Sequence, residues 1–193
     1  NLNFSFNFNK NIYSLKKIDM KINDIDITSP LIEIAKKKNS FFVNGKFINN
    51  KKNFDIEEFN LIFANLFKDK DIQKIEFSST NNFSFNVNRK FKFKNFKVES
   101  TINLNQLTFN GKNLKIKPYF PNFVEEIRLT DHKIVINYDK KKFDIKGNGN
   151  FSFGDISDEL SYQIVKNNGN FLFDSKINIK NNSLLIDFLD YKK

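Results

Sequence analysis

Polar and apolar side chains alternate along most of this chain, and phenylalanine takes many of the apolar positions. The clearest stretches are residues 4–8 and 83–87, where Ser or Asn stands between successive apolar residues. Successive side chains of a β-strand point to opposite faces, so this period of two places the phenylalanines on one face. Similar stretches recur to the end of the chain, with short polar connections between them. The pattern predicts a mainly β chain of successive antiparallel hairpins.

The alternation changes phase at two places, Asn23-Asp24 and Lys94-Asn95. A one-residue slip moves the apolar set to the other parity, which a β-bulge or a tight bend would explain. The pair Asn110-Gly111 indicates a hairpin turn. Residues 118–121, which begin and end with proline, are expected to be irregular or to lie at a sheet edge.

Residues 55–67 have the periodicity of a helix instead of a strand. Acidic residues stand in the first turn, where they favour the helix dipole. The polar face lacks the basic residues typical of helices that lie on membrane surfaces. We therefore expect one short amphipathic helix that packs against the sheet. Its apolar residues recur at three- and four-residue spacing: Ile56, Phe59, Ile62, Phe63, Leu66 and Phe67.

The chain of 193 residues has a formal net charge of +10. Such a balance suits nucleic acid or an anionic membrane surface. Sites that bind phosphate favour arginine, however, and arginine occurs only at Arg89 and Arg128. The abundance of Phe, Lys, Asn and Ile also matches a bias toward A/T-rich codons. The lysine runs 36–38 and 140–142 fall at expected turns, so we expect no nucleic-acid partner.

The residues that catalysis needs are few. The absence of cysteine excludes disulfides and thiolate metal sites. His132 is the only histidine, which excludes a multi-histidine metal site and a serine triad. It stands between two expected strands, where we expect it to face solvent in a turn. Asp155, Asp158 and Glu159 lack the spacing of a calcium loop. We expect no enzyme activity, no metal and no cofactor.

The apolar face is thus the candidate site, and three arrangements are possible. It could be the core of a closed sandwich, face lipid in a membrane barrel, or line a groove in an open, curled sheet. A membrane barrel needs an apolar band of about ten residues per strand, whereas many strands here carry only two or three apolar positions before Lys or Asp intervenes. Consecutive hairpins favour an extended, curled antiparallel sheet with an open groove. The alternative is a structural or adhesive β-sandwich with a closed Phe-rich core.

The candidate groove residues are the apolar members of the alternating stretches. They are Phe4, Phe6, Phe8, Phe83, Phe85, Val87, Phe91, Phe93, Ile134, Ile136, Phe151, Phe153, Phe171, Phe173, Ile177 and Ile179.

Residues 44–48, 54–56 and 75–79 resemble AsmA-like proteins of the TamB and YhdP type. The tail, residues 145–149 and 177–182, is similar to the repetitive strand regions of that family. The resemblance implies a curled β-sheet whose apolar groove holds phospholipid acyl chains. It also implies a periplasmic location in a Gram-negative bacterium, an inner-membrane anchor outside this segment, and a part in phospholipid transport to the outer membrane or in its maintenance. We therefore expect residues 1–193 to be one β-rich, repeat-like segment of a larger protein.

Overall fold

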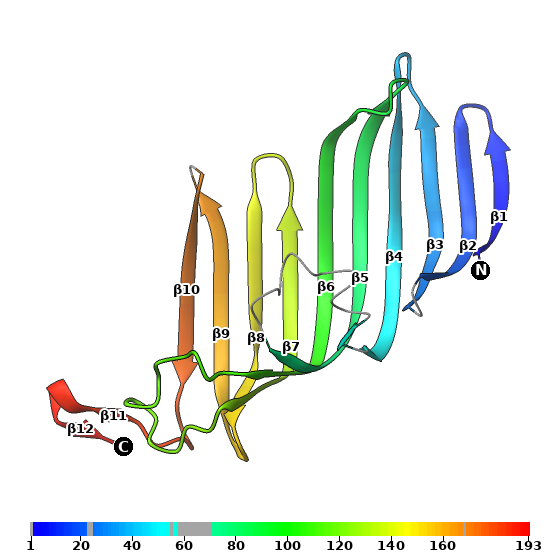
Figure 1. Ribbon diagram of the computed structural model, residues 1–193. Helices are drawn as coiled ribbons and strands as arrows, with labels where there is room; N and C mark the ends of the chain where they lie inside the picture. The colour runs from blue at the N-terminus through cyan, green and yellow to red at the C-terminus, as the bar shows by residue number, and fades with distance from the viewer. Residues whose placement is uncertain (1, 23–24, 55, 58–70, 168) are drawn as a thin grey trace.

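The computed structural model describes residues 2–22, 25–54, 56–57, 71–167 and 169–193. Within these ranges the chain forms a ten-stranded antiparallel sheet in which the strands lie side by side in sequence order (Figure 1). The expected mainly β fold of successive hairpins is confirmed. The strands are β1 (Leu2–Asn9), β2 (Ile12–Ile22), β3 (Ile25–Lys36), β4 (Ser40–Phe54), β5 (Ile72–Asn88), β6 (Phe93–Asn110), β7 (Glu126–Tyr138), β8 (Phe143–Phe153), β9 (Ile156–Asn167) and β10 (Asn170–Asn178).

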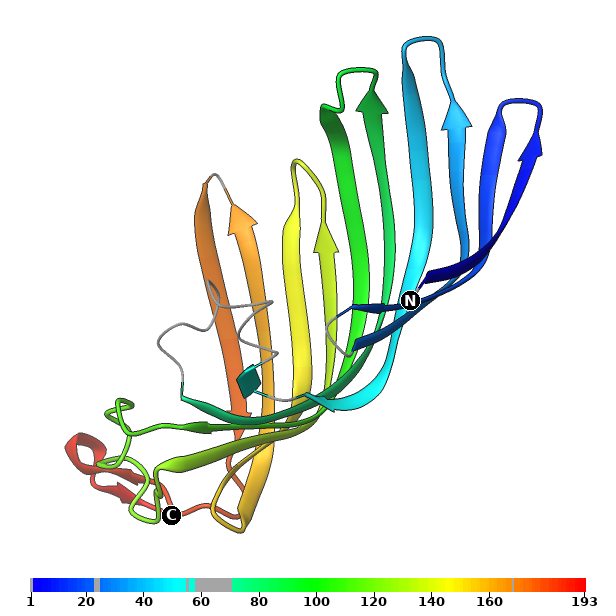
Figure 2. The ribbon, with the colours of Figure 1, turned by 45° about the vertical axis from the view of Figure 1, so that its right-hand side comes forward.

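The sheet is open, because β1 and β10 lie at its two edges and do not pair with each other. Its strands bend along their length, so that one end of the sheet curls over (Figure 2). The open, curled sheet expected from the sequence is confirmed. The helix expected at residues 55–67 falls almost wholly outside the described residues; of that stretch Ile56 and Glu57 are described, and both are helical.

The strands are longer than the alternating stretches suggested. β5 has 17 residues and β6 has 18, and each joins stretches that read as separate short strands. Phe91, expected in an alternating stretch, lies instead in the turn between β5 and β6. Asn88 closes that turn with its side-chain oxygen, which accepts hydrogen bonds from the backbone of Lys90 and Lys92. The hairpin expected at Asn110-Gly111 is also wrong, since a long connection, residues 111–125, joins β6 to β7.

A β-bulge explains the change of phase at Lys94-Asn95. The register between β5 and β6 shifts there, and Asn95 has a left-handed backbone with φ of 53°. As a result Phe93 and Phe96 lie on the same face, and their ring centroids lie 5.3 and 6.1 Å from that of Phe85. The expected slip is confirmed here. The other slip, at residues 23–24, lies outside the described residues.

Cross-strand pairs place most apolar side chains on one face of the sheet, which we call the Phe face. Lysines and asparagines, such as Lys46, Lys97 and Lys146, lie on the opposite face. The Phe face carries Phe4, Phe6 and Phe8 on β1, Met20 on β2, Ile27 on β3, Val43 and Phe47 on β4, Phe77, Phe83, Phe85 and Val87 on β5, Phe93, Phe96 and Ile102 on β6, Ile134, Ile136 and Tyr138 on β7, Phe143, Phe151 and Phe153 on β8, Leu160 and Ile164 on β9, and Phe171, Phe173 and Ile177 on β10.

The Phe face is buried at its curled end. One cluster there comprises Ile25, Phe54, Ile72, Ile75 and Leu104. Each such side chain contributes about 1.5–3 kcal/mol when fully buried. These contacts hold the ends of β3 to β6 together and fix the curl.

A second buried cluster lies on β7 and β8 and is covered by the 111–125 connection. Phe153 is its centre, and the rings of Phe120 and Phe123 pack edge-on against it at 5.1 and 5.2 Å. On the edge strands β1 and β10 the Phe face stays accessible: Phe6 is 59% exposed and Phe173 67% exposed. The connection therefore covers only part of the face.

The C-terminal segment forms a small unit beyond β10. It contains β11 (Leu185–Ile186), the 3₁₀ turn η1 (Asp187–Leu189) and β12 (Tyr191–Lys192), and β11 pairs with β12. The backbone N–H of Leu185 donates to the carbonyl oxygen of Tyr119 in the 111–125 connection, at 2.9 Å. β11 and β12 thus form a two-stranded sheet, separate from the ten-stranded one, in the described part of the chain.

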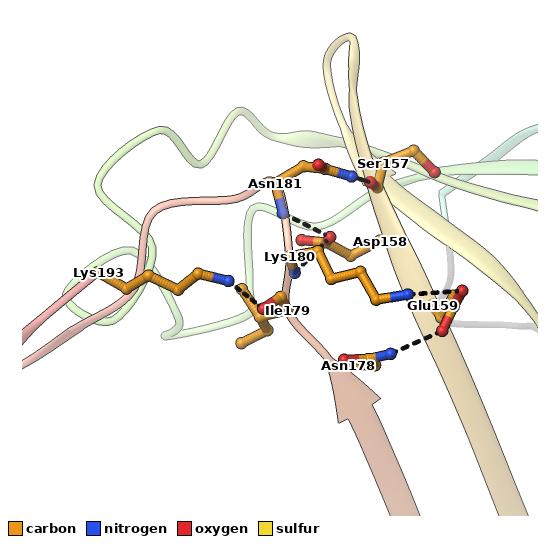
Figure 3. Close-up of polar contacts among 8 residues, drawn as sticks. All are labelled: Ser157, Asp158, Glu159, Asn178, Ile179, Lys180, Asn181 and Lys193. Atoms are coloured by element: carbon orange, nitrogen blue, oxygen red, sulfur yellow. Dashed lines mark hydrogen bonds and ion pairs between the residues drawn. The ribbon is translucent and has the colours of Figure 1, made fainter.

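Asp158 on β9 anchors this segment (Figure 3). Asp158 is buried, with 4% of its surface exposed. One carboxylate oxygen accepts hydrogen bonds from the backbone N–H groups of Lys180 and Asn181, at 2.7 and 2.8 Å. The other accepts from the backbone and side-chain N–H groups of Asn182, both at 2.9 Å. The carboxylate thus organises the turn that follows β10.

Candidate functional site

The Phe face is hollowed at the centre of the sheet into a cavity of about 580 Å³. We call it the central cavity. Its volume lies in the range of small-molecule binding sites, about 300–1,000 Å³. The described residues that line it include no charged side chain. They are Met20, Ile25, Ile27, Phe47, Asn49, Phe54, Phe77, Ser79, Asn81, Ser100, Ile102 and Ile136, from β2 to β7.

Irregular strand pairing shapes this cavity. The register of β4 against β5 shifts just after Asn49, and that of β5 against β6 shifts just before Phe77. Such shifts bend a strand and increase its twist. Phe54 and Phe77 stack at the curled end of the cavity, with ring centroids 4.6 Å apart. The cavity is therefore the hollow of the curl.

Four polar side chains cross the floor of the cavity: Asn49, Ser79, Asn81 and Ser100, which we call the polar strip. Asn49 pairs across the strands with Ser79, and Asn81 pairs with Ser100. The amide of Asn81 donates to the hydroxyl of Ser79 at 3.0 Å. Asn49 is only 9% exposed, yet its amide nitrogen has no hydrogen-bond partner among the described residues.

Aromatic rings continue from the cavity across the sheet to β10. Their separations fall within the range of favourable aromatic pairs, about 4.5–7 Å. We call this row the aromatic ladder. It comprises Phe47, Phe83, Phe85, Phe96, Tyr138, Phe143 and Phe171, with successive centroid distances of 4.8, 6.1, 6.1, 6.2, 6.4 and 5.5 Å.

Gly45 on β4 leaves room for the second ring of the ladder, Phe83. A Cβ atom at this position would lie 2.8 Å from Cζ of Phe83 and 2.9 Å from Cγ1 of Ile32. The ring of Phe83 therefore occupies the space that a side chain would fill. Further along, Phe96 and Phe171 are well exposed, so solvent reaches the ladder.

The groove residues expected from the sequence lie in several places. On the edge strands β1 and β10, Phe4, Phe6, Phe8, Phe171, Phe173 and Ile177 are exposed on the Phe face. On the inner strands, Phe83, Phe85, Val87, Ile134 and Ile136 are half-buried, and Phe93 is exposed. Of these, Ile136 also lines the central cavity.

Four of the expected residues do not contribute to an accessible groove in the sheet. Phe151 and Phe153 belong to the buried cluster beneath the 111–125 connection. Phe91 lies in the β5–β6 turn and is 81% exposed. Ile179 follows the end of β10.

Most residues of the cavity were absent from the expected set. Met20, Ile27, Phe47 and Ile102 continue the alternation of their own strands, so the same signal would have found them. The polar strip had no such signal, because Asn and Ser fill most positions between apolar residues. Its members are recognised only once the face is known.

His132 is buried, and the expectation that it faces solvent in a turn is wrong. It lies within β7 and is 1% exposed, directly after Asp131, a left-handed residue with φ of 55°. Nε2 donates to the carbonyl oxygen of Asn150 at 2.8 Å, while Nδ1 has no partner in the described ranges. The ring packs over Gly149, where a Cβ atom would overlap it, and lies 5.9 Å from the ring of Tyr162. Burial lowers the pKa of His132, so the imidazole is neutral at neutral pH.

In comparisons with known proteins, no family model, no curated protein and no solved structure matches the chain. The described residues contain no helix with the length and apolar character needed to cross a membrane. They also contain no cluster of three or more His, Asp and Glu side chains placed to hold a metal ion.

Proposed function

We propose that this chain is a non-enzymatic lipid-binding segment that shelters acyl chains on its Phe face. The observation that carries this proposal is the central cavity, an uncharged and mainly apolar hollow that continues into the solvent-accessible aromatic ladder. Exposed apolar surfaces of this kind are uncommon on soluble proteins unless something binds them. Each methylene buried there would contribute about 0.8 kcal/mol.

The resemblance to AsmA-like proteins supports the same proposal and extends it. In that setting the segment would lie in the periplasm and take part in phospholipid transport or outer-membrane maintenance, with the membrane anchor outside these residues. Acyl chains would lie in the cavity and along the ladder. Headgroups would stay at the rim, where Lys92 and Lys94 are exposed beside Phe93.

The proposal is tested by lipid extraction and mass spectrometry of the purified chain. We expect phospholipid to co-purify with the wild type. The variant I102E places a carboxylate in the cavity, where burial of an unpaired charge is costly. It should retain at most about a tenth of the lipid, a loss equivalent to about 1.4 kcal/mol.

The matched control is N103E, because Asn103 is the next residue of β6 and is exposed on the opposite face. N103E carries the same charge and should retain lipid like the wild type. Circular dichroism checks that both variants keep the β-sheet. Wild-type protein without lipid, or equal lipid in the folded I102E and N103E variants, would contradict the proposal.

A further inference from the structure

We propose that the polar strip recognises the ester carbonyl of an acyl lipid, so that the central cavity selects ester-linked over ether-linked chains. This inference rests on the proposed lipid-binding function and names the chemical class that the cavity prefers. It starts from the side chain of Asn49, a buried amide at the floor of an apolar hollow.

Asn49 carries a hydrogen-bond donor that the described residues leave unused. Buried polar groups in folded proteins nearly always have a partner, and an unpaired donor weakens the fold. Here the unpaired Nδ2 belongs to a residue that lines a cavity large enough for a ligand. Nδ2 itself is buried, so a rotation of the amide toward the cavity would bring it to an acceptor oxygen of a ligand, which would then satisfy it.

The chemistry of the lining indicates what kind of acceptor fits. The described lining residues include no Lys or Arg, so an anionic phosphate or carboxylate would enter without a countercharge. The donors that are present are neutral: the amides of Asn49 and Asn81 and the hydroxyls of Ser79 and Ser100, of which the Asn81 amide donates to Ser79. A carbonyl oxygen needs only such neutral donors. Once the acyl chain is buried, water no longer reaches the ester carbonyl oxygen, so a protein donor is its available partner.

The apolar side chains around the polar strip indicate where the hydrocarbon of the lipid would lie. Phe54 and Phe77 close the curled end of the cavity, and Phe47 begins the aromatic ladder on the other side of Asn49. A lipid with its ester at the polar strip can place hydrocarbon on both sides of it, one part against Phe54 and Phe77 and the other against Phe47. An ether-linked lipid offers the same hydrocarbon but replaces the carbonyl with a methylene.

The test compares two lipids that differ only in this linkage. The full chain is delipidated, and a bound, uncharged fluorescent acyl ester is displaced by dioleoyl phosphatidylglycerol or by its dialkyl ether analogue with the same headgroup and chains. We expect the ester lipid to bind about tenfold more tightly, as pairing of an otherwise unsatisfied buried donor predicts.

Variant N49L removes the donor and keeps a side chain of similar shape. It should bind both lipids with affinities within about twofold of each other. The control N44L makes the same change on the opposite face of β4, where Asn44 pairs with Glu33 and Ser84, and should keep the tenfold preference. Circular dichroism confirms the fold of both variants.

The outcomes separate this inference from the proposed function. If neither lipid displaces the probe, the proposed function fails and this inference with it. If wild type binds both lipids equally, lipid binding stands and ester recognition is overturned. A tenfold preference that persists in N49L also overturns it. Should N49L not fold, the ratio measured for wild type still decides.

Discussion

Replacement of Asp158 by alanine should release the C-terminal segment while β1 to β10 stay paired. The carboxylate accepts four hydrogen bonds from described residues 180–182, three of them from the backbone. It accepts from the backbone N–H groups of residues 180, 181 and 182 and so orders the turn after β10 (Figure 3). The strands before it are held by their own ladders and clusters. The loss should therefore be local to residues 179–193.

The magnitude follows from the hydrogen bonds of the carboxylate. A hydrogen bond to a charged group contributes about 1.5–3 kcal/mol, but bonds that share one group do not add fully. We expect D158A to lower the free energy of local opening by about 3–5 kcal/mol. D158N should lose roughly half as much, because one oxygen can still accept from Lys180 and Asn181.

Hydrogen exchange at the amides of residues 180–182 measures this opening directly. The control is E159Q, because Glu159 is the next residue and its exposed carboxylate also bonds the segment, through Asn178 and Lys180. An exposed contact of this kind contributes little. Unchanged protection in D158A, or an E159Q effect as large as that of D158A, would refute the reasoning.

The same network makes the segment sensitive to acid. Burial alone would raise the pKa of Asp158, but the hydrogen bonds from Asn182, Asn181 and Lys180 outweigh it and lower the pKa below the ordinary 3.8. The folded state therefore holds its proton less tightly than the unfolded state. The stabilisation is complete above pH 3.8 and is lost as the pH falls through the lowered pKa. D158A should lack this dependence in hydrogen exchange.

Two further predictions concern the sheet. The lowered pKa of His132, caused mainly by burial, means that the free energy of unfolding falls as the pH drops below 6.5. Urea unfolding between pH 7 and about 5 should show this fall in the free energy of unfolding in wild type and not in H132Q. A wild type whose free energy of unfolding does not change over this range would contradict the prediction. G45A should cost about 1–3 kcal/mol, because its Cβ atom would push against Phe83 and Ile32. N44A is the control in the same urea assay, and equal stability of the two variants would count against the close packing.

The face of each strand could be predicted from the sequence, because alternation carries that information directly. Phe4, Phe6 and Phe8 share a face in β1, as their spacing indicates. The same holds for Phe171 and Phe173 in β10. The open meander also followed from the short polar connections between stretches.

The lengths of the strands could not be predicted, because left-handed residues within a strand imitate its end. Asn95 and Asp131 both have positive φ and shift the parity of β6 and β7 without ending them. In the sequence alone, such a shift in parity is the same as the break between two short strands. His132 was misplaced for this reason, since it follows a bulge and not a turn.

The central cavity depends on contacts between strands that are far apart in sequence. Ile25 and Ile136 line the same hollow although more than a hundred residues separate them. Their distance depends on how far the sheet curls, which several bulges and two buried clusters determine together. No local sequence pattern indicates how far the sheet curls as a whole.

The pairing of each strand with its sequence neighbours has a consequence for how such a protein can change. In the described sheet no strand depends on a partner from a distant part of the chain. Addition or loss of one hairpin at an edge would leave every remaining pair in place, as in repeat proteins. The length of the apolar track can therefore vary through addition or loss of whole hairpins at an edge, while the pairing of the remaining strands stays the same.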